Sequence, residues 1–118
     1  IGLARTEYEA GDMTNALKHF HKAAEIDTQN PKAYYWTGKT LLELDRVEES
    51  MIFLEKAVQM APENRAYLWS LAGVYEKQGL ELQAAKSYCT LKQLAPFDKR
   101  IETKITQLQE KLGSNPCK

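Results

Sequence analysis

The chain lacks most of the features that mark metal-binding, disulfide-rich or membrane-spanning proteins. Its 118 residues include only two cysteines, Cys89 and Cys117, whose spacing fits neither a zinc site nor a disulfide scaffold. No apolar run exceeds four residues, as in Met51 to Leu54, whereas a membrane helix needs about 20. We therefore expect no metal, no membrane segment, and two free thiols in a reducing, cytoplasmic compartment.

The chain also has no excess of charge of either sign. Lys and Arg together number 16, as do Asp and Glu, and the isoelectric point is about 6.9. Nucleic-acid binding favours a basic excess, so the composition argues against a nucleic-acid partner. Glycine-rich phosphate loops, His-Glu-x-x-His zinc patterns and serine nucleophile elbows are all missing. The sequence therefore predicts neither an enzyme nor a cofactor site.

What the chain does contain is an internal repeat of 34 residues. Pro31–Asn64 can be laid over Arg65–Asp98, and the preceding residues 1–30 form a third, clipped copy. Matched pairs are Gly38 with Ala72, Ser50 with Ala84, Leu54 with Tyr88, Ala57 with Leu91, and Pro62 with Pro96. A fixed period of this length is typical of stacked supersecondary units that bury one another's apolar faces.

Each copy is expected to hold two helices, because its apolar residues recur at helical spacing and no strand pattern is found. Capping side chains are expected at the helix starts, on Asp12, Asn30, Asp45, Asn64 and Asp98. The expected helices cover residues 1–10, 13–26, 31–44, 65–78, 81–94 and 99–112. A further helix between the third and fourth of these is expected to present Val47, Met51, Leu54, Ala57 and Val58.

These copies predict one all-α domain over residues 1–113. It comprises a partial repeat over 1–30, repeats over 31–64 and 65–98, and a capping helix over 99–113, followed by a flexible tail over 114–118. The first helix lacks its opening turn and the chain starts at Ile1, so we expect a fragment of a longer protein. A targeting signal would then lie upstream.

The repeat carries a pattern of large and small residues at fixed places. One copy supplies Leu68, Ala72, Tyr75, Ala84, Tyr88, Leu91 and Pro96, and the copy before it supplies Tyr34, Gly38, Leu41, Ser50, Leu54, Ala57 and Pro62. This pattern resembles the tetratricopeptide repeat, over about Ile1 to Asp98, with mild departures such as Ser50 where the family has Ala. The resemblance implies a right-handed superhelical solenoid of antiparallel helix pairs. It also implies a protein-interaction module that binds a peptide or partner protein in a concave groove.

Carried over place by place, the resemblance assigns candidate groove residues on the first helix of each pair and adds two on the last helix, Arg100 and Lys104. Exposed Trp and Tyr make good binding anchors because they bury a large area at low entropy cost, although these rings could instead pack between adjacent helices. The basic residues near them would favour mildly acidic partners. The candidates are Arg5, Tyr8, Tyr35, Trp36, Lys39, Trp69, Ser70, Gly73, Arg100 and Lys104.

Other interpretations remain open at this point. Ile52 and Phe53 form a candidate outer contact, either for another chain or for self-association of a structural scaffold segment. The places where one subgroup of the family clamps the carboxylate of chaperone tails are poorly matched here, so that partner is disfavoured. RNA binding by the related pentatricopeptide class is disfavoured by the zero net charge. His19 and His21 point to different helix faces and are expected at the surface.

Overall fold

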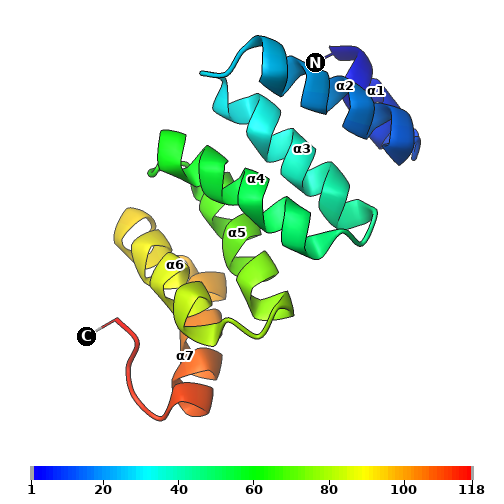
Figure 1. The fold of residues 1–118 in the computed structure, drawn as a ribbon. Helices are drawn as coiled ribbons and strands as arrows, with labels where there is room; N and C mark the ends of the chain where they lie inside the picture. Colours follow the sequence, from blue (N-terminus) through cyan, green and yellow to red (C-terminus); the bar gives the residue numbers. More distant parts are fainter. Residues whose placement is uncertain (1, 118) are drawn as a thin grey trace. The chain divides into compact units, whose positions relative to one another are not determined.

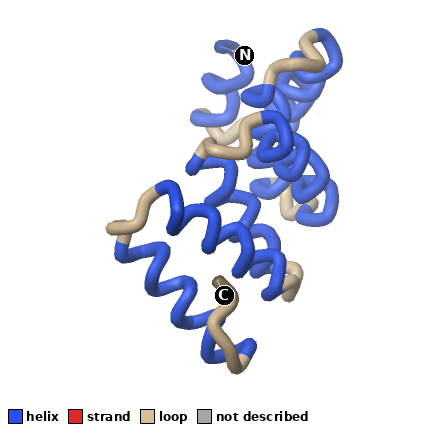
Figure 2. The backbone as a smooth tube through the Cα atoms, turned by 90° about the vertical axis from the view of Figure 1, so that its left-hand side faces the viewer, coloured by secondary structure: helices blue, strands red, loops and turns tan. Residues whose placement is uncertain are grey.

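The computed structural model describes residues 2–117, and this part of the chain consists of helices joined by short turns, without strands (Figures 1 and 2). Ile1, which we expected to open the first helix, lies outside the described residues. Within the described residues, each predicted helix is confirmed, and the predicted bounds agree with the structure to within two residues. They are α1 (Gly2–Glu9), α2 (Met13–Ile26), α3 (Pro31–Glu43), α4 (Val47–Met60), α5 (Arg65–Lys77), α6 (Glu81–Leu94) and α7 (Lys99–Leu112).

The helices form two compact units, each with its own core. Unit 1 is Ile1–Pro62, in which α1 packs on α2, α2 on α3, and α3 on α4. Unit 2 is Glu63–Lys118, in which α5 packs on α6 and α6 on α7. The predicted all-α fold class is therefore confirmed. The single domain over residues 1–113 and its repeat boundaries stay predictions.

Polar caps fix where the helices begin. Asn30, Asn64 and Asp98 are spaced by 34 residues, and each side chain accepts a hydrogen bond from a backbone N–H of the helix that follows. The acceptor–donor distances are 3.1, 3.1 and 2.9 Å. Asp12 caps α2 in the same way through the N–H of Asn15. These bonds satisfy donors that would otherwise be unpaired at the first helical turn, as the sequence predicted.

Asp45 does not cap α4, so that prediction was wrong. The residue takes the left-handed conformation, with φ of +62°, and the N-cap of α4 is Arg46, which makes no side-chain capping bond. Gly11 and Gly79, one period away on either side, have φ of +86° and +72°. At all three places the next residue donates its N–H to a carbonyl five residues back, which is the Schellman end of the preceding helix. The backbone at this place therefore needs a left-handed residue rather than a cap.

Small residues let the paired helices approach closely in both units. In unit 1, Gly38 of α3 faces Leu54 of α4, and a Cβ added there would lie 2.8 Å from the Cγ of Leu54. In unit 2, Ala84 and Tyr88 of α6 are buried. The apolar stripe of α7 covers the open side of α6 with Ile101, Ile105 and Leu108. α7 therefore acts as the capping helix that the sequence predicted.

Cys89 of α6 and Cys117 of the tail form a disulfide, so the prediction of free thiols was wrong. The chain runs back along α6 through α7, which brings Lys111 to 3.8 Å from Glu81. A left-handed Gly113, with φ of +77°, then reverses the tail toward Cys89, and the two Cα atoms lie 5.4 Å apart (Figure 1). The sequence spacing alone does not reveal this reversal. The expected cytoplasmic location thereby loses its premise, because disulfides persist mainly in oxidising compartments.

Candidate functional site

The candidate groove residues of unit 1 converge on one another. Arg5 and Tyr8 lie three residues apart on α1 and therefore share a helix face, while Tyr35 and Trp36 are adjacent on α3 and Lys39 follows them about one turn later. Their side chains meet between the two helices, and we call these five residues the aromatic–cation cluster. The structure thus brings together from α1 and α3 the residues that the sequence assigned to this unit.

Trp36 is the centre of the cluster. Its ring stacks on Phe20 of α2 at 5.6 Å between centroids and an angle of 15°, and Phe20 itself is fully buried. Tyr8 and Tyr35 approach the same ring edge-on, at 5.4 and 5.5 Å. Trp36, Tyr8 and Tyr35 are all half-buried. The ring therefore packs against the core on one side and keeps part of its surface at the outside of unit 1.

Two cations cover the outer part of Trp36. The guanidinium carbon of Arg5 lies 5.1 Å from the ring centroid, and the Lys39 Nζ lies 5.3 Å from it. Lys39 also lies over Tyr35 at 5.5 Å and Tyr8 at 6.0 Å. Within residues 2–117 Lys39 has no carboxylate partner, whereas Arg5 is 3.7 Å from Glu9. The positive charge of Lys39 is thus balanced only by aromatic rings, an attraction of about 0.5–2 kcal/mol.

Tyr8 adds a hydrogen-bonding group at the edge of the cluster. Its hydroxyl donates to Oε1 of Glu43 at 3.4 Å. Burial raises the pKa of Tyr8, and the nearby Glu43 carboxylate raises it further. Tyr8 therefore stays a neutral donor across the physiological range. Glu43 lies one turn beyond Lys39 on α3, a spacing that places both residues on the same helix face.

Unit 2 holds a second, differently balanced group around Trp69 of α5. Tyr88 of α6 meets the Trp69 ring edge-on at 5.5 Å, and Arg100 of α7 lies over that ring at 5.2 Å. The Tyr88 hydroxyl donates a hydrogen bond to Glu76. Burial, and to a smaller extent the Glu76 carboxylate, strongly raises the pKa of Tyr88. Glu76 in turn holds Lys104 at 3.3 Å. These contacts link all three helices of unit 2.

The two cations expected to attract acidic partners in unit 2 are already paired. Arg100 donates to both carboxylate oxygens of Asp98, at 3.2 and 2.9 Å, and this lowers the pKa of Asp98 and raises that of Arg100. Lys104 is paired with Glu76. The remaining candidates, Ser70 and Gly73, are half-buried on α5, and the space beside Gly73 is open. Among the four candidate groove cations, Lys39 is therefore the one without a carboxylate partner within residues 2–117.

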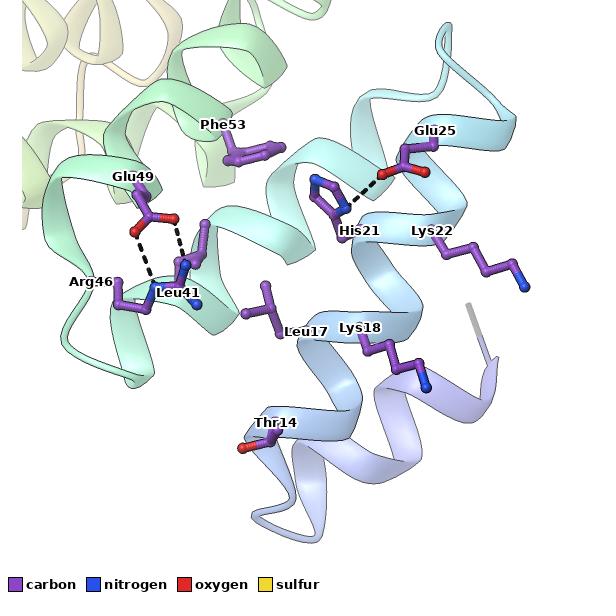
Figure 3. A pocket seen from close by; sticks show the side chains of 10 residues that line it. All are labelled: Thr14, Leu17, Lys18, His21, Lys22, Glu25, Leu41, Arg46, Glu49 and Phe53. Atoms are coloured by element: carbon purple, nitrogen blue, oxygen red, sulfur yellow. Dashed lines mark hydrogen bonds and ion pairs between the residues drawn. The ribbon is translucent and has the colours of Figure 1, made fainter.

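A hollow of about 540 Å³ lies on another face of unit 1, between α2 and α4 (Figure 3). Of the two residues predicted as an outer contact, Ile52 is 63% exposed and Phe53 is half-buried. Phe53 meets His21 edge-on at 5.7 Å and Tyr34 at 6.4 Å. Sequence reasoning placed Ile52 and Phe53 at the surface but missed the hollow, because its far wall comes from another helix pair.

His21 is exposed and pairs with Glu25 at 2.9 Å, while His19 is half-buried and bonds to Glu7 at 2.6 Å. Across residues 2–117, no three His, Cys, Asp or Glu side chains gather as a set that could hold a metal ion. In the same range, no helix has the length and apolarity required to span a membrane.

Comparison with known proteins places the chain among tetratricopeptide repeats. Residues 7–75, more than half of the chain, match the model of the tetratricopeptide repeat family. The Protein STIP1 homolog of Dictyostelium discoideum is 27% identical over 103 residues. That match covers 86% of this chain but 18% of the relative, so the chain spans about a fifth of the relative's length.

Solved structures share the fold at low sequence identity. The crystal structure of MamA has a TM-score of 0.88 and 22% identity, over 96% of this chain and 66% of that one. The type III secretion chaperone SycD of Yersinia enterocolitica, in complex with a peptide of the translocator YopD, scores 0.86 at 14% identity, over 94% and 90%. The first TPR of Spaghetti (RPAP3), bound to the HSP90 peptide SRMEEVD, scores 0.86 at 14% identity, over 96% and 90%.

Proposed function

The chain belongs to the tetratricopeptide repeat family, and we propose that it is a non-enzymatic module that binds an acidic peptide segment of a partner protein on the aromatic–cation cluster of unit 1. The observation that carries this proposal is the position of Lys39. Its ammonium group lies within 6.0 Å of three aromatic centroids and has no carboxylate partner in residues 2–117. A carboxylate of the partner could form an ion pair with this ammonium group.

The cluster suits a segment with one acidic and one apolar side chain. Arg5 and Lys39 cover the outer part of Trp36, so a partner must draw at least one of them aside to reach the ring. A carboxylate can do so, since a charge-assisted hydrogen bond to an ammonium is stronger than a half-exposed cation–π contact. The partner's apolar side chain can then pack on Trp36 and Tyr35, which are held in place by Phe20 and by each other.

The comparisons support a peptide-binding role without specifying the partner. The structures of SycD and Spaghetti with the same fold were solved with bound peptides, and the Spaghetti peptide SRMEEVD carries three acidic residues. At 14% identity these likenesses extend to the fold alone. The choice of an acidic segment for this chain therefore rests on Lys39, and the choice of unit 1 over unit 2 rests on the pairing of Arg100 and Lys104.

Fluorescence anisotropy with two labelled peptides tests the proposal. SRMEEVD serves as the acidic probe, and the same peptide with Gln and Asn in place of its acidic residues serves as the neutral probe. We expect the acidic peptide to bind at least fivefold more tightly. Lys39→Ala should remove most of that difference, and Trp36→Ala should weaken both peptides by about 2 kcal/mol or more.

Lys86→Ala is the matched control, because Lys86 of unit 2 is exposed and has no carboxylate partner among the described residues 2–117. It makes the same change in net charge and should leave both affinities unchanged. Circular dichroism of each variant checks that the helices persist. Equal binding of the two peptides, or a loss with Lys86→Ala as large as with Lys39→Ala, would rule out recognition by the cluster.

A further inference from the structure

The hollow between α2 and α4, which we call the outer hollow, shares no residue with the aromatic–cation cluster. Its floor is apolar, formed by Leu17 of α2, Leu41 of α3 and Phe53 of α4, and Figure 3 shows these three side chains along the gap between α2 and α4. A volume of about 540 Å³ falls within the roughly 300–1,000 Å³ that ligand-binding pockets occupy. The hollow is therefore large enough for side chains of a partner.

The floor stays open because its largest side chain is held to one side. Phe53 is fixed by the ring of His21 at 5.7 Å and by Tyr34 at 6.4 Å, so it lines the hollow instead of filling it. Leu17 is half-buried, so part of its apolar surface remains exposed in the hollow. An apolar surface of this kind, rimmed by polar residues, is typical of an interaction site.

The border of the outer hollow has an uncompensated positive charge on one side. Of its two carboxylates, Glu49 is paired with Arg46 through bonds of 3.1 and 2.7 Å, while Glu25 lies 2.9 Å from His21, which is charged only when protonated. The three cations of the border, Lys18, Lys22 and Arg46, therefore outnumber its two carboxylates. Lys18 and Lys22 lie one turn apart on α2 and have no ion-pair partner within residues 2–117. Figure 3 shows both side chains extending from the side of α2 that faces away from Leu17 and Phe53, so they lie at the outer edge of the hollow.

We propose that the outer hollow binds an acidic amphipathic helix of a partner protein. α2 and α4 are 14 residues each, about 21 Å long, and they flank a trough into which the side-chain ridge of a third helix can pack. Apolar side chains at i and i+4 of that helix contact Leu17 and Phe53. Its acidic residues on the α2 side pair with Lys18 and Lys22. This site is independent of the peptide site of the proposed function.

An NMR titration with a designed helix tests the inference. The probe is a synthetic amphipathic peptide of about 15 residues, with Leu on one face and Glu on its flanks, and the comparison peptide carries Lys in place of every Glu. We expect the Glu peptide to shift the resonances of Leu17, Leu41 and Phe53 while leaving those of Trp36 unchanged. Its affinity should exceed that of the Lys peptide at least fivefold.

The double variant Lys18→Glu, Lys22→Glu should weaken the Glu peptide about tenfold and strengthen the Lys peptide. Both positions are exposed, so the fold is expected to persist. Lys86→Glu with Lys92→Glu in unit 2 makes an equal change in net charge and should have no effect. Trp36→Ala should also leave this binding intact, which separates it from the peptide site.

Four outcomes would overturn the inference. The Glu peptide could cause no shift up to millimolar concentration, or the two peptides could bind equally well. The shifts could instead gather around Trp36. Light scattering could show that the chain alone forms a dimer that the peptide disrupts, in which case the occupant of the outer hollow is a second copy of the chain.

Discussion

At the scale of single residues, two glycines that look alike in the sequence have opposite packing. Gly38 lies where α3 touches α4, and a Cβ there would meet Leu54 Cγ at 2.8 Å and the Ser50 carbonyl oxygen at 3.2 Å. Gly73 lies in the middle of α5 with no atom within 4 Å of such a Cβ. The first glycine is therefore required by packing, and the second only lowers helix propensity.

Gly38→Ala should destabilise the protein by about 1–3 kcal/mol, because the added methyl group forces Leu54 or the α4 backbone to move. Gly73→Ala should stabilise it by about 0.5–1 kcal/mol through helix propensity alone. Urea denaturation followed by circular dichroism measures both changes. Similar effects of the two substitutions would contradict this account of the α3–α4 contact.

Asp45 is the one repeat position at which the left-handed helix end is not a glycine. Asp45→Gly should stabilise the protein by up to about 1 kcal/mol, since an L-residue pays about 1–2 kcal/mol in this conformation and Asp recovers part of it. Asp27→Gly is the matched control. Asp27 follows α2 with φ of −117°, so the substitution there brings no conformational relief and removes the hydrogen bond that Oδ1 accepts from the Gln29 N–H. Thermal melts of both variants compare the two, and an equal shift would argue against strain at Asp45.

At the scale of elements, the sequence predicted what depends on neighbours along the chain. Helix ends capped by Asn30, Asn64 and Asp98 follow from local hydrogen bonding, and helical periodicity fixed the buried stripe of α7. Sequence reasoning missed the contacts that depend on how helices pack side by side. The Glu76–Lys104 pair spans α5 and α7, 28 residues apart, and neutralises a cation that sequence reasoning had offered to partners.

The disulfide is an element-scale constraint on α7, because it closes a loop of 28 residues that contains the whole helix. Reduction by a dithiol, or Cys117→Ser, should lower the stability of unit 2 by about 2–4 kcal/mol through the greater freedom of the unfolded chain. Hydrogen exchange should accelerate in α7 and stay unchanged in α2. Ser114→Ala in the same tail is the control and should have no effect. If the exchange rates in α7 are the same before and after reduction, the disulfide does not stabilise this helix.

At the scale of the whole molecule, the two units have separate cores, so a defect in one need not propagate to the other. Each repeat in such proteins contributes its own stability plus a term for its neighbours. Phe20 belongs to unit 1 and is fully buried in a cluster with Ala4 and Ala16. Tyr88, also fully buried, is its counterpart in unit 2.

Phe20→Ala should cost about 3–5 kcal/mol by leaving a cavity beneath Trp36. Because α1 to α3 share that core and α4 packs on α3, hydrogen exchange measured by mass spectrometry should rise throughout unit 1, while α5 to α7 keep most of their protection. Tyr88→Ala should produce the reverse pattern. A uniform loss of protection in both variants would mean that the units unfold as one cooperative body. The acidic-peptide site and the outer hollow would then be lost together with any damage to unit 2.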